Sequence, residues 1–205
     1  MQRVAAPHRC ALLARRLCAR AASAAPAVQQ PEERVVIVDL ANTVVGEASR
    51  RDMRARNLPY RASFVLLFRS SGELFVQRRV AWKETYPGHF DCAPGGVVQS
   101  GESYEQNAAR EMEEEMGVRG TPLTPLFDFW FEDAATRVWG RLFSCVYDGP
   151  VTLQASEVES GAWLSLDAAQ DAAPCCPDSR AALEEYRRRL DAGQLTLPYS
   201  GGAAA

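Results

Sequence analysis

The segment from Gly96 to Val118 constrains the fold of this chain most strongly, because it joins a glycine-containing turn to a helix with closely spaced acids. Glu111, Glu114 and Glu115 stand at positions i, i+3 and i+4. In a helix these carboxylates share one face, with Cβ atoms roughly 5–6 Å apart, and they repel one another. A hard divalent cation cancels the repulsion, and Mg²⁺ prefers carboxylate, water and phosphate oxygens. The spacing therefore predicts a cation-binding helix face.

Residues 103–116 have the apolar period of a helix, and Gly117 is its expected C-terminal stop. The residues expected to face the core recur at spacings of three and four: Ala108, Ala109, Met112 and Met116. This apolar side would anchor the acidic face to the protein. The glycine-rich turn before the helix would let the backbone approach phosphate groups closely.

Strands rather than further long helices are expected on both sides of this segment. Alternating or β-branched runs predict strands at 35–38, 62–69, 73–79, 127–131, 136–146 and 161–164. The stretch 70–73 is a hairpin signal, and residues 50–57 are a short helical or irregular link. Asp178 and Ser179 are expected to cap a final helix that continues through Leu190. This order predicts an α+β domain.

Charge divides the chain into a basic head and an acidic body. The first 31 residues hold five arginines and no acid, whereas the remainder holds 18 basic and 26 acidic residues, so its net charge is 18 − 26 = −8. An acidic body repels nucleic-acid phosphates, so no nucleic-acid partner is expected. No apolar stretch approaches the roughly 18 residues of a membrane-spanning helix, so no membrane partner is expected either.

The acid-free, Ala- and Arg-rich residues 1–30 predict an organelle transit peptide, for a mitochondrion or a plastid. A general bias toward Arg and Ala is the alternative, and the protein would then be cytoplasmic. Residues 31–192 form the predicted domain, and 193–205 form a disordered tail by composition.

The six cysteines have no CxxC spacing, which favours reduced thiols. The sequence has only two histidines, so few residues are available for a histidine-based site.

A longer pattern of identities makes the acidic helix distinctive, although an acidic triplet alone is typical of a solvated helix face. The segment matches G-x5-E-x7-R-E-U-x-E-E-x-G-U, where U is apolar, and so resembles the Nudix hydrolase family. The seven residues specified by identity are Gly96, Glu102, Arg110, Glu111, Glu114, Glu115 and Gly117. At about 7% usage for each residue type, a chance match is on the order of one in 10⁸ per start position.

The resemblance implies an α/β/α sandwich with a mixed sheet and a catalytic loop and helix. It also implies hydrolysis of a phosphoanhydride bond in a small nucleoside- or organic-diphosphate substrate, with Mg²⁺ or Mn²⁺ as cofactor. By the resemblance, Glu111, Glu114 and Glu115 bind the metal with the Gly96 carbonyl, and Gly95 and Gly96 approach the substrate. Arg110 and Glu102 brace the loop and helix by an ion pair, and Glu111 or Glu115 orients or deprotonates the attacking water.

Two other functions stay open, and the oligomeric state is not indicated. The wider stretch from Val35 to Gly96 resembles isopentenyl-diphosphate-isomerase-like Nudix proteins, which makes an isomerase the first alternative. The catalytic cysteine of that branch would fall at Gly95, however, and Cys92 lies three residues too early. The second alternative is a domain that binds a nucleotide or diphosphate without hydrolysis. No metal-binding glutamate of the pattern is missing, which favours an enzyme.

Several further side chains are candidates for the substrate pocket. Trp82 and Phe131, near the ends of predicted strands, are the preferred aromatic candidates, whereas Trp139 and Trp163 are expected in the core. A distal acidic residue is also expected, and three candidates compete without a ranking: Glu132, Glu157 and Glu159.

Overall fold

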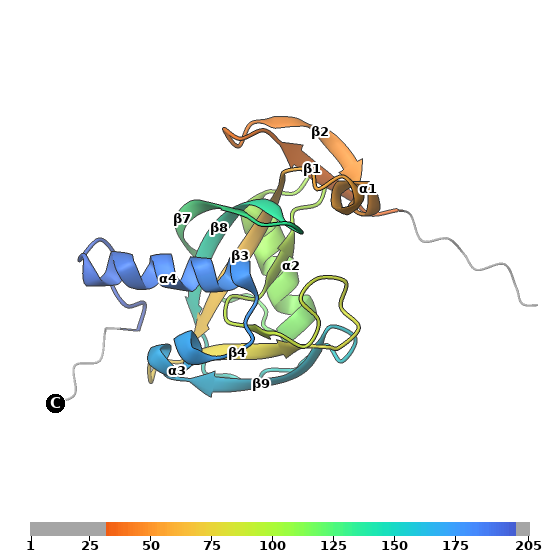
Figure 1. Ribbon diagram of the computed structural model, residues 1–205. Coiled ribbons are helices and arrows are strands. Elements are labelled where there is room, and N and C mark those ends of the chain that lie inside the picture. The colour runs from red at the N-terminus through yellow and green to blue at the C-terminus, as the bar shows by residue number, and fades with distance from the viewer. Residues whose placement is uncertain (1–31, 200–205) are drawn as a thin grey trace, which may run out of the picture. The chain divides into compact units, whose positions relative to one another are not determined.

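A mixed β-sheet forms the centre of the part of the chain that the computed structural model describes, residues 32–199 (Figure 1). The predicted leader at 1–30 lies outside the described residues. The strands are β1 (Arg34–Val38), β2 (Val44–Ser49), β3 (Tyr60–Phe68), β4 (Leu74–Arg79), β5 (Phe90–Asp91), β6 (Gly95–Val97), β7 (Thr124–Glu132), β8 (Arg137–Val146) and β9 (Val158–Leu164). The helices are α1 (Arg50–Ala55), α2 (Tyr104–Met116), α3 (Leu166–Asp171) and α4 (Pro177–Asp191).

Strand β3 organises the sheet because it pairs with neighbours on both edges. It runs parallel to β8 over its whole length and antiparallel to β1, β4 and β6. The sheet order is β2-β1-β3-β4-β5, with β7 on the outer side of β8 and β9 beside β4. Seven consecutive residues of β3, from Ala62 to Phe68, are buried. Such a continuous buried run, in which Ser63 is the one polar residue, is typical of a strand covered on both faces.

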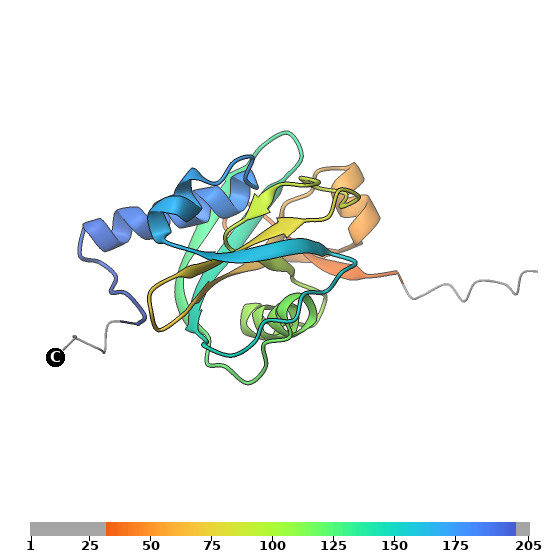
Figure 2. The ribbon, with the colours of Figure 1, turned by 90° about the horizontal axis from the view of Figure 1, so that it is seen from below.

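The side chains of β3 alternate between the two faces of the sheet and so contribute to two separate apolar cores. Phe64 and Leu66 join the core under α4, which contributes Leu183 and Tyr186. Val65 and Leu67 join the core under α2. Figure 2 shows α2 on one face of the sheet and α3 with α4 on the other. The α+β class and the α/β/α sandwich with a mixed sheet are therefore confirmed.

Helix α2 begins and ends where its sequence predicts. Ser103 caps it by accepting from the Gln106 backbone N–H, and the Gln106 side chain accepts in return from the Ser103 N–H. Gly117 ends the helix at φ 68°, a left-handed conformation that glycine adopts without strain. The prediction that Ala109 faces the core is wrong, because Ala109 is exposed and Glu115 is buried in the helix instead.

Several boundaries differ from expectation. The edge strand β2 was not predicted, because most of its side chains are exposed and show no apolar period. Helix α4 begins at Pro177, with Cys176 at the N-cap position, so Asp178 and Ser179 lie inside the first turn rather than before it.

The described part of the expected tail, 193–199, returns to the core through Tyr199, whose ring centroid lies 5.4 Å from that of Phe68. Within 32–199 no helix combines the length and apolar character needed to cross a bilayer.

Candidate active site

A cavity of about 400 Å³ opens beside the acidic side of α2. Its walls come from α1, β3, β6, the loop 80–89, α2 and the first turn of α4. Eight carboxylates line it: Glu33, Glu84, Asp91, Glu111, Glu114, Glu115, Glu157 and Asp178. Five basic side chains line it as well: Arg50, Arg54, Arg79, Lys83 and Arg110. The lining therefore has a formal net charge of −3, and an anionic ligand needs additional positive charge to enter.

Gly95 and Gly96 lie in the short strand β6 rather than in a turn, and both line the cavity. Paired with β3, they are too crowded to carry side chains. A Cβ on Gly95 would lie 2.0 Å from the Ser63 carbonyl oxygen, and a Cβ on Gly96 would lie 2.1 Å from Glu111 Oε1. The absence of a side chain at residue 96 therefore lets the Glu111 carboxylate rest against the backbone.

Glu111 is a largely buried carboxylate on the cavity wall. Its side chain is 13% exposed, and Oε1 lies 2.9 Å from Arg110 Nη1. Burial raises the pKa of Glu111 to about 7, although Arg110 opposes the shift. A buried carboxylate of this kind gains from any additional cation that reaches it.

Glu115 is buried more completely, with 4% of the residue exposed. Gln77 Nε2 donates to its Oε2 at 2.9 Å, and Lys83 Nζ lies 3.6 Å from its Oε1. Burial raises the pKa of Glu115, while Lys83 opposes the shift. Lys83 also forms an ion pair with Glu157, so one ammonium group lies between two carboxylates. Burial lowers the pKa of Lys83.

The predicted ion pair between Arg110 and Glu102 is present and bidentate. Arg110 Nε and Nη2 donate to the two Glu102 oxygens at 2.8 and 3.2 Å. Burial alone would raise the pKa of Glu102, but hydrogen bonds from Arg110 and Asn107 lower it below the usual value. Arg110 Nη1 also donates to the exposed Glu114 at 2.9 Å. Arg110 therefore joins the loop before α2 to the acidic residues of the helix.

The donor set suits a hard divalent cation. Glu111, Glu114 and Glu115 offer carboxylate oxygens, and the Gly96 backbone, against which Glu111 rests, adds a carbonyl. In the present arrangement, no three acidic, histidine or cysteine side chains within 32–199 converge on one point. Arg110 and Lys83 hold the carboxylates instead. Glu114 is half exposed, so it can turn from Arg110 toward a cation at little cost.

Of the three competing distal acids, only Glu157 lines the cavity. Glu132 pairs with Arg137 and Glu159 pairs with Arg78, and neither glutamate lines the cavity.

Among the aromatic candidates, Trp82 lines the cavity and is 72% exposed. Phe131 does not line it and packs against the core under α4, so it is a wrong candidate. As expected, Trp139 and Trp163 pack against the core under α2.

The cavity lining also holds a second group of charges, which sequence reasoning missed. Arg79 lies 3.5 Å from Asp91, and both side chains are largely buried. Asp178, in the first turn of α4, faces this pair, and Tyr60 completes the wall. Burial, reinforced by Asp91, raises the pKa of Asp178 to about 7. Four different elements supply these side chains, so no spacing in the sequence reveals them.

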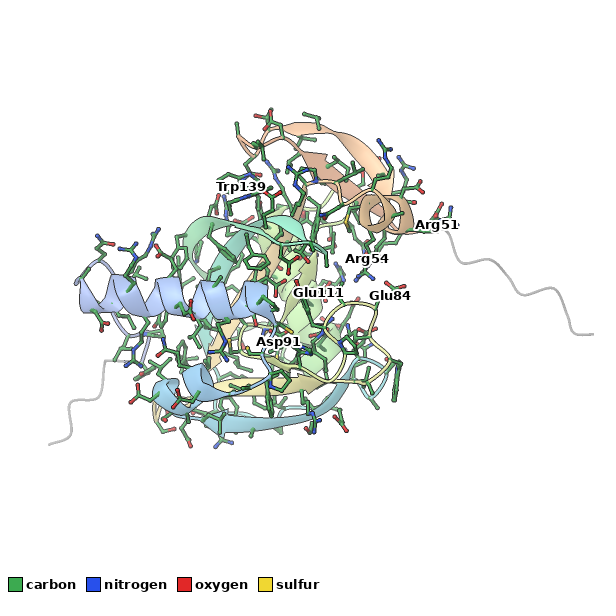
Figure 3. All side chains as sticks on the ribbon, in the orientation of Figure 1. Arg51, Arg54, Glu84, Asp91, Glu111 and Trp139 are labelled. Carbon is green, nitrogen blue, oxygen red and sulfur yellow. The ribbon has the colours of Figure 1, made fainter. Side chains whose placement is uncertain are left out.

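Two ion pairs flank the cavity. Arg50 of α1 binds Glu33 at 3.0 Å, and Arg54 of α1 binds Glu84 of the loop 80–89. Figure 3 shows Arg54 and Glu84 directed toward each other, and Glu111 and Asp91 in the region between α1 and α4. These pairs connect α1 to Glu33, just before β1, and to the loop 80–89.

Comparison with known proteins identifies close relatives. A family model described as the NUDIX domain matches residues 58–186. An uncharacterized Nudix hydrolase of Yersinia pestis is 42% identical over 170 residues, which cover 80% of this chain and 92% of that protein. The uncharacterized Nudix hydrolase YfcD of Escherichia coli K12 is 42% identical over 160 residues, covering 77% of this chain and 88% of YfcD.

Solved structures share the fold. The DR0079 protein of Deinococcus radiodurans superposes with a TM-score of 0.65 at 25% identity, covering 75% of this chain and 98% of that one. The MutT protein of Methanosarcina mazei superposes with a TM-score of 0.58 at 25% identity, covering 64% and 95%.

Proposed function

The chain belongs to the Nudix hydrolase family, which acts on phosphoanhydride bonds, and we propose that it cleaves a small diphosphate-linked substrate in a reaction that needs Mg²⁺ or Mn²⁺. The observation that carries the proposal is the position of the family pattern in the structure. Glu111, Glu114, Glu115 and Gly96 all line one cavity, where Arg110 joins them to Glu102.

In the proposed mechanism, Glu111, Glu114, Glu115 and the Gly96 carbonyl hold the metal. A bound divalent cation supplies Lewis-acid stabilisation and lowers the pKa of water. Glu111 or Glu115 orients or deprotonates the attacking water. Arg110 keeps the helix and the preceding loop in register.

Lys83 and Arg79 are proposed to contact the diphosphate. Both line the cavity, and their side chains are only 16% and 12% exposed, so solvent screens their charge weakly. Each lies within 4 Å of a carboxylate. A phosphate group that enters would compete with Glu115 and Glu157 for Lys83, which then stabilises the bound anion.

The organic part of the substrate is proposed to be rich in hydrogen-bond donors, as a ribose or sugar is. Asp91, Asp178 and Tyr60 make the part of the cavity wall outside α2 polar. A prenyl chain placed there would remove water from these groups without replacing its hydrogen bonds, which is costly. The proposed class is therefore a nucleoside or sugar diphosphate.

Isomerisation of a prenyl diphosphate is the alternative, and the structure offers it little support. A cysteine at position 95 would collide with the Ser63 carbonyl oxygen. Cys92 is 1% exposed, donates to the Ser179 carbonyl oxygen at 3.4 Å, and does not line the cavity. Binding without hydrolysis is the second alternative, and all the acidic positions of the family pattern are filled.

A substrate screen tests the proposal. The purified protein is incubated with dinucleotides, sugar nucleotides, coenzyme A derivatives, oxidised nucleotides and prenyl diphosphates, and products are identified by mass. We expect cleavage of a nucleoside- or sugar-containing member with Mg²⁺ or Mn²⁺ and none with EDTA. Turnover that persists in EDTA contradicts the metal requirement, and interconversion of isopentenyl and dimethylallyl diphosphates favours the isomerase.

For localisation, the proposal is import into a mitochondrion or plastid through residues 1–30. A fluorescent fusion that carries residues 1–35 should enter an organelle. Diffuse cytosolic fluorescence would instead favour compositional bias as the origin of the arginines.

A further inference from the structure

Two thiols from distant parts of the chain meet beneath the cavity. Cys92 follows β5, and Cys175 lies just before α4, 83 residues later, yet their Sγ atoms are 4.0 Å apart. Both are free cysteines in the structure. The Ser179 hydroxyl lies near both sulfurs, at 3.7 Å from Cys92 and 3.9 Å from Cys175.

Backbone pairing holds the two sulfurs together, so their proximity does not depend on side-chain rotation alone. Phe90 and Cys175 form a parallel β-bridge. The Phe90 N–H donates to the Pro174 carbonyl at 2.8 Å, and the Cys176 N–H donates to the Phe90 carbonyl at 2.8 Å. These two bonds fix the segment before α4 against the end of β5. A disulfide needs its sulfurs at about 2.05 Å, so they must approach by about 2 Å.

The two thiols differ in access and acidity. Cys175 is partly exposed, whereas Cys92 is 1% exposed. The contact between the two sulfurs lowers the pKa of Cys175, and the same contact, together with burial, raises the pKa of Cys92. Cys175 is therefore the thiol that an oxidant can reach and that more readily forms the reactive thiolate.

We propose that Cys92 and Cys175 are an oxidation site at which a peroxide forms a reversible disulfide. The Cys175 thiolate attacks one peroxide oxygen, giving a sulfenic acid and releasing the other oxygen, which takes up a proton as water. The Cys92 sulfur then attacks the Cys175 sulfur, the S–O bond breaks, and the hydroxyl leaves with the Cys92 proton as a second water. Two thiols lose two electrons, and a dithiol reductant reverses the change.

The bond would tie together two pieces of the cavity wall. Asp91 is adjacent to Cys92, and Asp178 lies in the first turn of the helix that follows Cys175; both line the cavity. The cross-link would draw these carboxylates nearer to each other and so slow turnover several-fold. Disulfide formation does not depend on the proposed hydrolase function, whereas the effect on turnover rests on it.

The other described cysteines provide matched controls. Cys176 is adjacent to Cys175 but shows no contact with another sulfur, and a relaxed disulfide between neighbouring residues is not possible. Cys145 lies in the core under α2, on the other face of the sheet. Cys176→Ser and Cys145→Ser should therefore leave the proposed reaction intact.

The test uses the full chain, reduced and then treated with hydrogen peroxide. We expect the number of titratable thiols to fall by two, and mass spectrometry of unreduced peptides to link Cys92 to Cys175. The melting temperature should rise by about 5–10 °C, because the bond closes a long loop, and dithiothreitol should reverse the rise. Cys92→Ser and Cys175→Ser should abolish all three changes. Position 175 is partly exposed, so Cys175→Ser should fold even if the buried Cys92→Ser does not.

Three outcomes would overturn the proposal: unchanged thiol numbers, a disulfide between other cysteines, or sulfinic acid at Cys175 beside an intact Cys92 thiol. Turnover of the best substrate in the screen is measured in parallel on oxidised and reduced protein. A loss in the wild type and in Cys176→Ser, but not in Cys175→Ser, supports the effect on the cavity wall. Equal turnover with the bond formed would remove that effect and leave the oxidation site.

Discussion

On α2, Glu111 and Glu115 each have a basic side chain within 4 Å, whereas Asp178 of α4, which lines the same cavity, has none among residues 32–199. Both groups are acidic, and Arg79 pairs with Asp91 in the second one, but Asp178 itself has no ion-pair partner among the described residues. A metal that binds α2 must displace Arg110 and Lys83 from their carboxylates. Asp178 needs no such exchange, because a ligand with hydrogen-bond donors can pair with it directly.

The largest expected effect concerns the buried carboxylates of α2. Glu111→Gln and Glu115→Gln should each lower kcat/KM for the best substrate by at least about 100-fold, because each removes a carboxylate proposed to hold the metal or the attacking water. Initial rates measured with saturating Mg²⁺ provide the value.

Glu113→Gln is the matched control. Glu113 lies on the same helix but is exposed and pairs with Arg119 outside the cavity. Its turnover should equal that of the wild type. If Glu113→Gln loses as much activity as Glu115→Gln, the α2 carboxylates act only through the stability of the helix.

A second expectation separates a metal site from a solvated acidic face. Mg²⁺ or Mn²⁺ at a hundredfold excess over its dissociation constant should stabilise the wild type by about 2–3 kcal/mol. Glu115→Gln should lose most of this gain, and without metal it should be as stable as the wild type or slightly more so. Thermal melts in EDTA, Mg²⁺, Mn²⁺ and NaCl at matched ionic strength measure both effects. Superimposable shifts in the two proteins would contradict the metal site.

A third expectation concerns Asp178. The pKa of Asp178 is raised from an ordinary 3.8 to about 7, so the folded protein holds this proton more strongly than the unfolded chain does. Raising the pH from about 4 to about 7 removes the proton and costs the folded state stability, and the full cost remains above pH 7. The titratable groups that face Asp178 include Asp91, Arg79, Tyr60, Tyr86 and Cys176.

Asp178→Asn should therefore be more stable than the wild type at pH 8, by about 1–3 kcal/mol, and the difference should shrink toward pH 4. Urea unfolding at several pH values measures it. Asp167→Asn, an exposed first-turn acid of α3, is the control and should be slightly destabilising. A stability difference for Asp178→Asn that does not change with pH would show that burial does not raise the pKa of this carboxylate.

The smallest expected effect concerns Glu114 of α2. Its side chain is half exposed, and among residues 32–199 it bonds only to Arg110. Glu114→Gln removes this ion pair and also the repulsion from Glu111 and Glu115, so without metal the stability should change by less than about 0.5 kcal/mol. Thermal melts in EDTA test this. A loss above 1 kcal/mol would mean that the pair with Arg110 holds α2 in place.

The sequence predicted those parts of the fold and site that are determined by residues close together in the chain. The helix over 103–116, its stop at Gly117 and the pair between Glu102 and Arg110 all depend on residues within one short segment. The remaining cavity residues could not be predicted in this way. Lys83, Arg79 and Asp178 come from separate elements, and only the packing of α4 and the loop 80–89 against the sheet brings them to one cavity.

The errors have similar causes. Ala109 fits an apolar helical period, but the helix turns Glu115 inward instead, because Gln77 and Lys83 supply its polar contacts from the strand and loop beneath. The tail predicted at 193–205 ends in small residues, but Tyr199 within it packs beside Phe68. Contacts over long sequence distance decided both cases.

Lys83 is also the one lysine in the sequence, and its ammonium group lies between Glu115 and Glu157. Apart from the chain's terminal amine, an acylating reagent therefore has one target, and that target is on the wall of the cavity. The extent of labelling would report directly whether the cavity is filled. Footprinting with an amine-reactive ester could rank ligands by their protection of a single peptide, even for ligands that are bound but never cleaved.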